Sequence, residues 1–201
     1  MLDLPGAARG IAGAWRLAKL DPQGLSYFDT SVEGFWRSFQ AAIVAAPLFA
    51  VLILLRTAEH PLSEDPMRAF FIETIGYVIG WTAFPLAAWY LASALGKANR
   101  YFGYIVAYNW ANVIQVTAFV PIAALSAFGG LPDTIIVVLA LLLTAAVIYY
   151  QFFIVRTALG IDALPALGFV AIDLMLGLAL DAVETSLHLA DMVEPVSTSL
   201  P

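Results

Sequence analysis

The chain has 201 residues, of which 62% are hydrophobic and only 12% are charged, and its formal net charge is −6. Soluble domains are about half apolar and about one quarter charged, so this composition indicates a protein embedded in the lipid bilayer. The absence of cysteine excludes disulfides, thiolate metal sites and cysteine nucleophiles. The acidic balance argues against nucleic acid as a partner.

The first segment, residues 1–34, is predicted to be a cytoplasmic amphipathic arm followed by a polar hinge. Wound as a helix, it gathers apolar side chains on one face, namely Leu4, Ile11, Trp15 and Ala18. A basic helix with a tryptophan on its apolar face suits the headgroup layer. The residues expected at the membrane surface are Arg9, Trp15, Arg16 and Lys19. The alternative is a cytosolic helix that caps the bundle through the same apolar face.

Five further segments are long and apolar enough to cross a bilayer, which requires about twenty residues of helix. They cover residues 38–55, 69–95, 101–128, 135–155 and 166–180, and the last continues as helix into acidic sequence. The sequence therefore predicts an all-α, polytopic bundle of five transmembrane helices within residues 35–190. A short polar C-terminal tail, residues 191–201, follows it.

The basic residues predict the orientation of this bundle, because Lys and Arg concentrate in cytoplasmic loops. Seven lie on the side of the N-terminal arm: Arg9, Arg16, Lys19, Arg37, Lys97, Arg100 and Arg156. Two, Arg56 and Arg68, lie on the opposite side. We expect a multi-pass protein of the bacterial inner membrane with a cytoplasmic N-terminus and a periplasmic C-terminus.

The second span carries a G-x-x-x-G motif, Gly76 to Gly80. Small residues at this spacing let two helix backbones approach closely. Packing within the bundle is favoured over homodimerisation, because the motif is common in polytopic proteins.

Two acids within the spans are candidates for binding a proton or an ion. Asp173 lies well inside the fifth span, and Glu73 lies about one turn inside the second. An ionisable group at such depth suggests function, although pairing within the bundle is the simpler interpretation of both. For Glu73, the expected neighbours are Arg68 and Arg56. Further along the fifth helix, Glu184, His188 and Asp191 share its acidic face, which we interpret as a solvated helix end rather than a metal site.

The third span contains three amides, Asn109, Asn112 and Gln115, for which hydrogen bonds to neighbouring helices are expected. The surrounding residues 94–125 resemble bacterial members of the Ypt-interacting-protein (Yip) family. The matching positions are Gly96, Lys97, Arg100, Phe102, Tyr108 and Pro121. This resemblance implies a five-span protein with a cytosolic N-terminus, and it supplies no catalytic residue.

No motif of an enzyme is present, and the two histidines, His60 and His188, lack the spacing of a metalloprotease. We therefore predict a non-enzymatic scaffold or accessory subunit of Yip-like architecture, without cofactor or metal. Its expected partners are the lipid bilayer and other membrane proteins or a second copy of itself. The alternative is a small transporter or channel that uses Asp173.

Overall fold

The computed structural model describes the backbone of residues 3–59 and 66–197, and the side chains of residues 3–55 and 67–188. Within these ranges the chain is helical and has no strand, so the predicted all-α fold class is confirmed. The elements are α1 (Leu4–Ala18), η1 (Pro22–Tyr27), α2 (Val32–Ser38), α3 (Gln40–Glu59), α4 (Pro66–Ala94), η2 (Ala98–Arg100), α5 (Tyr101–Ala127), α6 (Asp133–Leu159) and α7 (Ala163–Ser197).

Five segments of the described chain are long and apolar enough to span a membrane, as predicted. They are Val32–Leu55, Met67–Ala94, Ala98–Ala127, Asp133–Leu159 and Ala163–His188. The helix α6 extends from the predicted end at residue 155 to Leu159, whereas α4 and α5 end within one residue of their predicted ends. Gly96, Gly129 and Gly160 have positive φ angles at the ends of α4, α5 and α6, a conformation that glycine adopts without steric cost.

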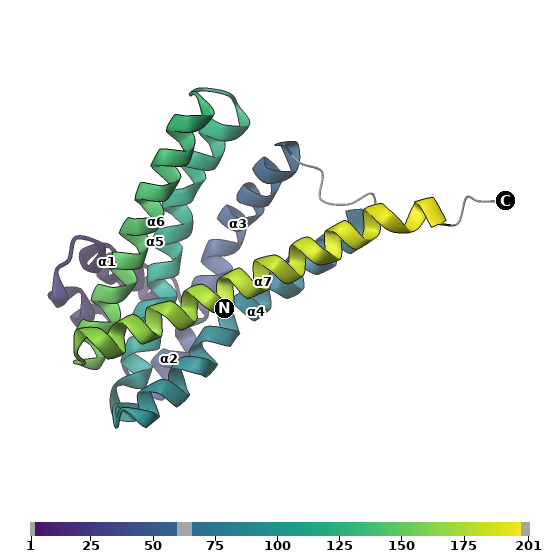
Figure 1. The fold of residues 1–201 in the computed structure, drawn as a ribbon. Coiled ribbons are helices and arrows are strands. Elements are labelled where there is room, and N and C mark those ends of the chain that lie inside the picture. Colours follow the sequence, from purple (N-terminus) through teal and green to yellow (C-terminus); the bar gives the residue numbers. More distant parts are fainter. Residues whose placement is uncertain (1–2, 60–65, 198–201) are drawn as a thin grey trace.

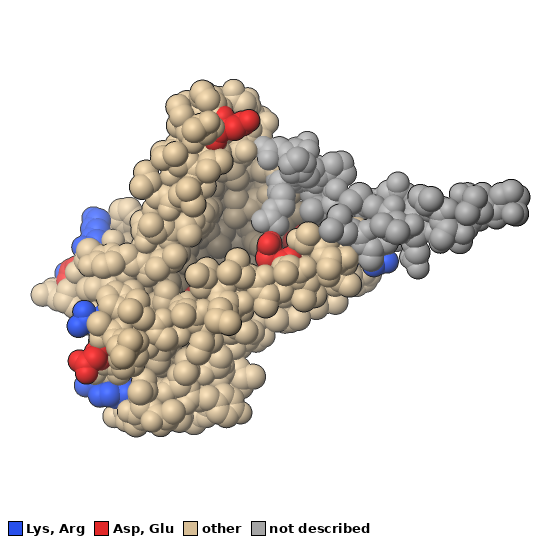
Figure 2. Space-filling view, viewed as in Figure 1, with Lys and Arg blue, Asp and Glu red and all other residues tan. Residues whose placement is uncertain are grey.

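The spans form two groups that diverge (Figure 1). One group contains α3, α5 and α6, and the other is the antiparallel pair of α4 and α7. The groups meet at the end of the molecule where α1 lies, here called the arm end, and separate towards the opposite end, here called the far end. Basic side chains gather on the surface of the arm end (Figure 2).

The core of the protein lies in the arm half. On α5, the residues from Tyr104 to Ala111 are all buried, whereas those from Ile114 to Ala127 are partly or fully exposed. On α6, the buried residues are Tyr150, Gln151, Ile154, Val155 and Leu159. The central helix α5 is therefore packed on all sides near the arm, and the other spans each bury one face against it there before they project towards the far end.

The arm helix α1 contacts the bundle through its small residues. Its buried positions are Ala7, Gly10, Gly13, Ala14 and Leu17. A Cβ atom added at Gly10 would lie 2.3 Å from Cε2 of Trp110, so the α1 backbone lies directly on this indole ring. The hydroxyl of Tyr150 donates a hydrogen bond of 2.7 Å to the carbonyl of Ala14. Packing therefore uses a different face from the apolar one expected, because only small side chains allow this approach.

The expected apolar face of α1 points partly outwards: Leu4 is 72% exposed and Trp15 is 53% exposed. Nζ of Lys19 lies 5.1 Å from the centroid of the Trp15 ring. Arg16 is tied to the following turn, because its Nε donates to Oδ2 of Asp21 at 2.7 Å. The docked arm thus keeps an aromatic and basic surface that is free for the membrane-surface contact expected from the sequence.

Candidate functional site

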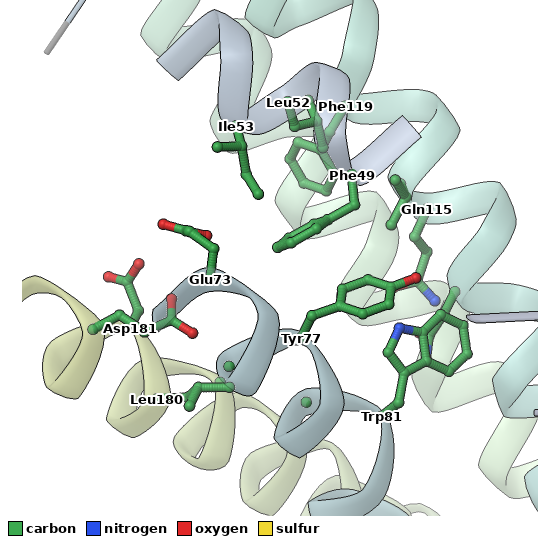
Figure 3. Close-up of a pocket in the computed structure, with 16 residues that line it drawn as sticks. Phe49, Leu52, Ile53, Glu73, Tyr77, Trp81, Gln115, Phe119, Leu180 and Asp181 are labelled. Atoms are coloured by element: carbon green, nitrogen blue, oxygen red, sulfur yellow. The ribbon is translucent and has the colours of Figure 1, made fainter. Parts of the chain in front are cut away.

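A pocket of about 410 Å³ opens between the two helix groups on the far side of the core. We call this space, with the opening between the groups beyond it, the cleft. Figure 2 shows a hollow in this region, and Figure 3 shows the side chains around the pocket. One wall is apolar and consists of Phe49, Leu52, Ile53, Val116 and Phe119 from α3 and α5. The opposite wall carries the carboxylates of Glu73, Asp181 and Glu184 from α4 and α7.

Glu73 is the most deeply placed of these acids, with a side chain that is only 10% exposed. Its Oε1 lies 3.4 Å from Nε2 of His188, which is also buried. Neither ring nitrogen of His188 has a hydrogen-bond partner among the described residues. The expected neighbour, Arg68, instead donates from Nη2 to the carbonyl of Leu187 at 3.3 Å. The structure therefore places His188 beside Glu73, and the side chain of Arg56, the other expected neighbour, lies outside the described residues.

The glycines of the G-x-x-x-G motif lie against α7. A Cβ atom at Gly76 would overlap Oε1 of Glu184, and one at Gly80 would lie 3.7 Å from Cδ2 of Leu180. The absence of side chains at these positions lets α4 and α7 approach and leaves room for the Glu184 carboxylate.

Asp173 is not among the residues that line the pocket. Its Oδ1 accepts a hydrogen bond of 2.7 Å from the hydroxyl of Tyr108 on α5. The Tyr108 ring is buried and lies 4.6 Å, centroid to centroid, from that of Phe84. Asp173 therefore joins the α4–α7 pair to the other group near the point where they diverge, and it does not share a cavity with Glu73.

The three amides of α5 have different surroundings. Nδ2 of Asn109 donates to Oγ of Ser38 at 2.8 Å, and Nε2 of Gln151 donates to Oδ1 of Asn112 at 3.4 Å. Nε2 of Gln115 is buried and has no hydrogen-bond partner in the described part of the chain. Asn112 and Gln115 both line the pocket. The amide nearest the arm end thus connects helices, whereas Gln115 presents an unused donor at the cleft.

A second cavity of about 250 Å³ lies between α1, α2 and α5, and Arg9 and Arg37 line it. Arg37 pairs with Asp29 at 2.9 Å, which supplies the counter-charge within the cavity wall. Arg9, Trp15, Arg16 and Lys19 therefore do not converge on one site; they are distributed over α1 and the turn that follows it.

The sequence predicts a solvated helix end, rather than a metal site, at the far end of α7. Among the described side chains, no group of three His, Cys, Asp or Glu residues is close enough to hold a metal ion. Of the three acidic-face residues considered from the sequence, Glu184 and His188 are described, and the side chain of Asp191 lies outside the described residues.

The sequence did not predict which residues contact the polar side chains of the spans. The Tyr108–Asp173 pair joins residues 65 positions apart, and the apolar wall of the cleft comes from a different helix group than the acids. The one available signal was the shared face of Asp181 and Glu184 on the fifth helix, a face that the structure directs to the cleft.

Comparisons with protein-family models, curated proteins and solved structures found no match for this chain. The fold therefore defines its class, a multi-pass helical membrane protein. The resemblance to the Yip family stays a prediction.

Proposed function

We propose that this protein is a non-enzymatic accessory subunit of a membrane complex and that it receives a transmembrane helix of a partner protein in the cleft. The observation that carries the proposal is the divergence of the two helix groups. Packed transmembrane helices lie about 8–10 Å apart, so a lateral opening between diverging groups is filled by lipid or by another helix. The apolar wall of the cleft suits either occupant.

A small residue in the cleft favours a helix. Gly177 of α7 lines the pocket, and no described atom lies within 4 Å of a Cβ added there. Glycine at an open position allows the backbone of a second helix to approach closely, which is the main source of helix affinity in lipid. Two other surfaces that could bind a partner helix are used internally, because Gly76 and Gly80 face α7 and the aromatic half of α5 is buried. The cleft is therefore the better docking surface.

Photo-crosslinking in native membranes tests this proposal. A photoreactive amino acid placed at Leu52 or Phe119 reports on the cleft, and the same amino acid at Leu142, which is 63% exposed on α6, reports on the outer surface. We expect a protein adduct of one discrete mass from the cleft positions only. Adducts to lipid alone, or the same products from all three positions, would contradict helix docking.

The alternative function, a transporter or channel that uses Asp173, has less support from the geometry. Asp173 is hydrogen-bonded to Tyr108 and lies outside the pocket lined by Glu73. Flux of protons or cations into proteoliposomes, lost on Asp173→Asn, would favour transport over the accessory role.

We also propose that the arm end faces the cytoplasm of a bacterial cell and that the far end faces the periplasm. The chain lacks cysteine, so a single introduced cysteine reports position without background. With a membrane-impermeant maleimide on intact cells, Gly130→Cys at the far end should react and Ala98→Cys at the arm end should not. The reverse pattern would invert the proposed orientation.

A further inference from the structure

We infer that the cavity between α1, α2 and α5 binds a zwitterionic lipid headgroup, in which a phosphate is joined to an ammonium group. The cavity has a volume of about 250 Å³ and shares no lining residue with the pocket of the cleft. It lies at the arm end (Figure 1), so this inference goes beyond the proposed docking of a helix and does not depend on it.

The cavity lies where the first span begins. Arg37 and Gln40 line it, and residues 41–55, which follow Gln40, have only apolar side chains. Polar and basic residues at the end of a span lie at the level of the lipid headgroups. Arg9 and Tyr27 in the cavity wall are exposed, so a headgroup can enter from outside the protein.

The unused hydrogen-bond donors of the wall are complementary to a phosphate. The Arg9 guanidinium forms no ion pair or hydrogen bond with a described residue. Trp110, which also lines the cavity, is only 4% exposed, and its indole Nε1 donates no hydrogen bond within the described chain. Oε1 of Gln40 accepts from the N–H of Asp3 at 3.0 Å, whereas Nε2 of Gln40 has no described acceptor. A guanidinium and neutral N–H donors together suit the oxygens of a phosphate.

The acidic groups of the wall supply the opposite sign, because three carboxylates share the one guanidinium of Arg37. They belong to Asp29, Glu33 and Asp3, at distances of 2.9, 3.8 and 4.0 Å. Asp29 and Asp3 line the cavity, whereas Glu33 lies outside the lining. This excess of negative charge attracts an ammonium group and repels a ligand that has a phosphate alone. A headgroup with both charges therefore suits Arg9 as well as the acids.

Apolar side chains beside the cavity favour a lipid over a soluble compound. Leu4 follows Asp3 and is 72% exposed, and Trp36 precedes Arg37 and is 68% exposed. Exposed apolar side chains at the headgroup level can contact acyl chains. The group in the cavity is therefore expected to belong to an intact membrane lipid.

Lipid titration of the delipidated full-length protein tests this inference. The probes are phosphatidylethanolamine, which carries the ammonium group, and phosphatidylglycerol, which lacks it, with identical acyl chains. Native mass spectrometry measures the dissociation constant of the first bound lipid. We expect phosphatidylethanolamine to bind at least about tenfold more tightly. Equal binding of the two lipids, or tighter binding of phosphatidylglycerol, would overturn the inference.

Glycerophosphoethanolamine separates a lipid from a soluble ligand, because it has the headgroup without the acyl chains. We expect it to displace phosphatidylethanolamine only at about 100-fold excess or more, since it lacks the apolar contacts. Displacement at equal concentrations would contradict the assignment to a lipid and would indicate a soluble phosphate ester.

Two basic residues of the arm provide a matched pair of variants. Arg9→Gln removes the free guanidinium of the cavity, whereas Lys19→Gln removes a positive charge beside Trp15, outside the cavity. We expect only Arg9→Gln to weaken the binding of phosphatidylethanolamine, by about tenfold. Equal losses in the two variants would show a general attraction of lipid to a basic surface and would refute a specific site. Arg9 has no described partner to lose, so Arg9→Gln should fold normally, which thermal unfolding checks.

Asp3→Asn tests the ammonium contact without loss of the helix cap. Oδ1 of Asp3 accepts from the N–H of Gly6 at 3.0 Å, and asparagine is also a preferred N-cap residue. We expect the preference for phosphatidylethanolamine over phosphatidylglycerol to fall at least about threefold, because one of the carboxylates is removed. An unchanged preference would exclude Asp3 and its neighbours as the ammonium site.

Discussion

The arm half and the far half of the same helices are packed in opposite ways. On α6, Leu159 and Ile154 in the arm half are fully buried, whereas Leu141 and Leu142 in the far half are 64% and 63% exposed. In water, such a row of exposed leucines would aggregate, but in a bilayer lipid tails solvate it. The protein therefore resembles a closed helical core from which spans project, and its proposed binding surface lies among the projecting parts.

The difference follows from what each half contains. In the arm half, α1, η1 and α2 add layers to the five spans, and hydrogen bonds from Tyr150 and Asn109 join separate elements. Among the described residues, the far half contains only the spans, and α4 as a whole packs mainly on α7. Tight packing thus depends on the short helices, and docking of a partner helix is expected where they are absent.

The largest effect should come from truncating a core leucine. Leu159→Ala in the arm half should lower the free energy of unfolding by about 3 kcal/mol, because it leaves a cavity. Leu142→Ala, the same change on the same helix, should alter it by less than about 0.5 kcal/mol. Reversible unfolding in mixed micelles measures both. Similar losses would show that the two halves are equally packed.

Next in size is the effect of a side chain between α1 and α5. Gly10→Val should cost about 2 kcal/mol, since its Cβ would lie 2.3 Å from the Trp110 ring and α1 must move. Limited proteolysis should then cut the arm faster than in the native protein. Gly168→Val, where no described atom is near, is the control. An unchanged cleavage rate for Gly10→Val would mean that α1 is not docked on this ring.

The hydrogen bond that joins the two helix groups should have a smaller effect. Tyr108→Phe removes the donor to Asp173 and should destabilise the protein by about 1.5 kcal/mol, because the partly buried carboxylate loses this hydrogen bond. Asp173→Asn should cost less, since an amide oxygen can still accept from the Tyr108 hydroxyl. Thermal unfolding of both variants compares them. A larger loss from Asp173→Asn would indicate a role for the charge itself.

Truncation of two amide side chains of α5 compares the stability contributed by a hydrogen bond in the arm half with that in the far half. Asn109→Ala should cost about 1 kcal/mol, because it removes the bond to Ser38 in the packed half. Gln115→Ala should cost nothing measurable, since Nε2 of Gln115 has no partner in the described chain. Unfolding in mixed micelles again provides the measurement, and a greater loss at Gln115 would contradict this assignment of the two amides.

The smallest predicted effect is a loss of stability at acidic pH in the turn that follows α1. The backbone N–H of Gln23 and the Arg16 side chain lower the pKa of Asp21 below its usual value. A lowered pKa means that the ionised form stabilises the fold above the unfolded pKa of about 3.9 and that this contribution is lost as the pH falls through the folded pKa. The hydrogen-exchange protection factors of residues 16–28 should therefore fall below about pH 4. Asp21→Asn should remove this acid dependence, and an identical pH profile in the variant would exclude Asp21 as its cause.

Periodicity and residue type predicted most of the fold. The five spans follow from apolar runs. The end of the fourth span was predicted at residue 155, whereas α6 continues to Leu159 and ends at the turn of Gly160. The arm was predicted as a helix, but the face through which it packs was not. Hydrophobicity favoured the side of Leu4 and Trp15, whereas close approach to Trp110 required Gly10, and close approach to Tyr27 and Phe28 required Gly13. The periodicity of apolar residues along α1 does not show which of its faces fits sterically against α5.

For the candidate site, the sequence alone identified the unusual acids Glu73 and Asp173 and the amides of the third span, because charge and polarity are conspicuous in apolar sequence. Only the tertiary structure decided that Tyr108 satisfies Asp173, that Glu73 opens into the cleft beside His188, and that Gln115 keeps an unused donor. Whether a chain resides in the bilayer depends on the summed hydrophobicity of its residues, so the amino-acid composition determines it. The pairing of buried groups depends on how helices far apart in the chain cross, which no local pattern records.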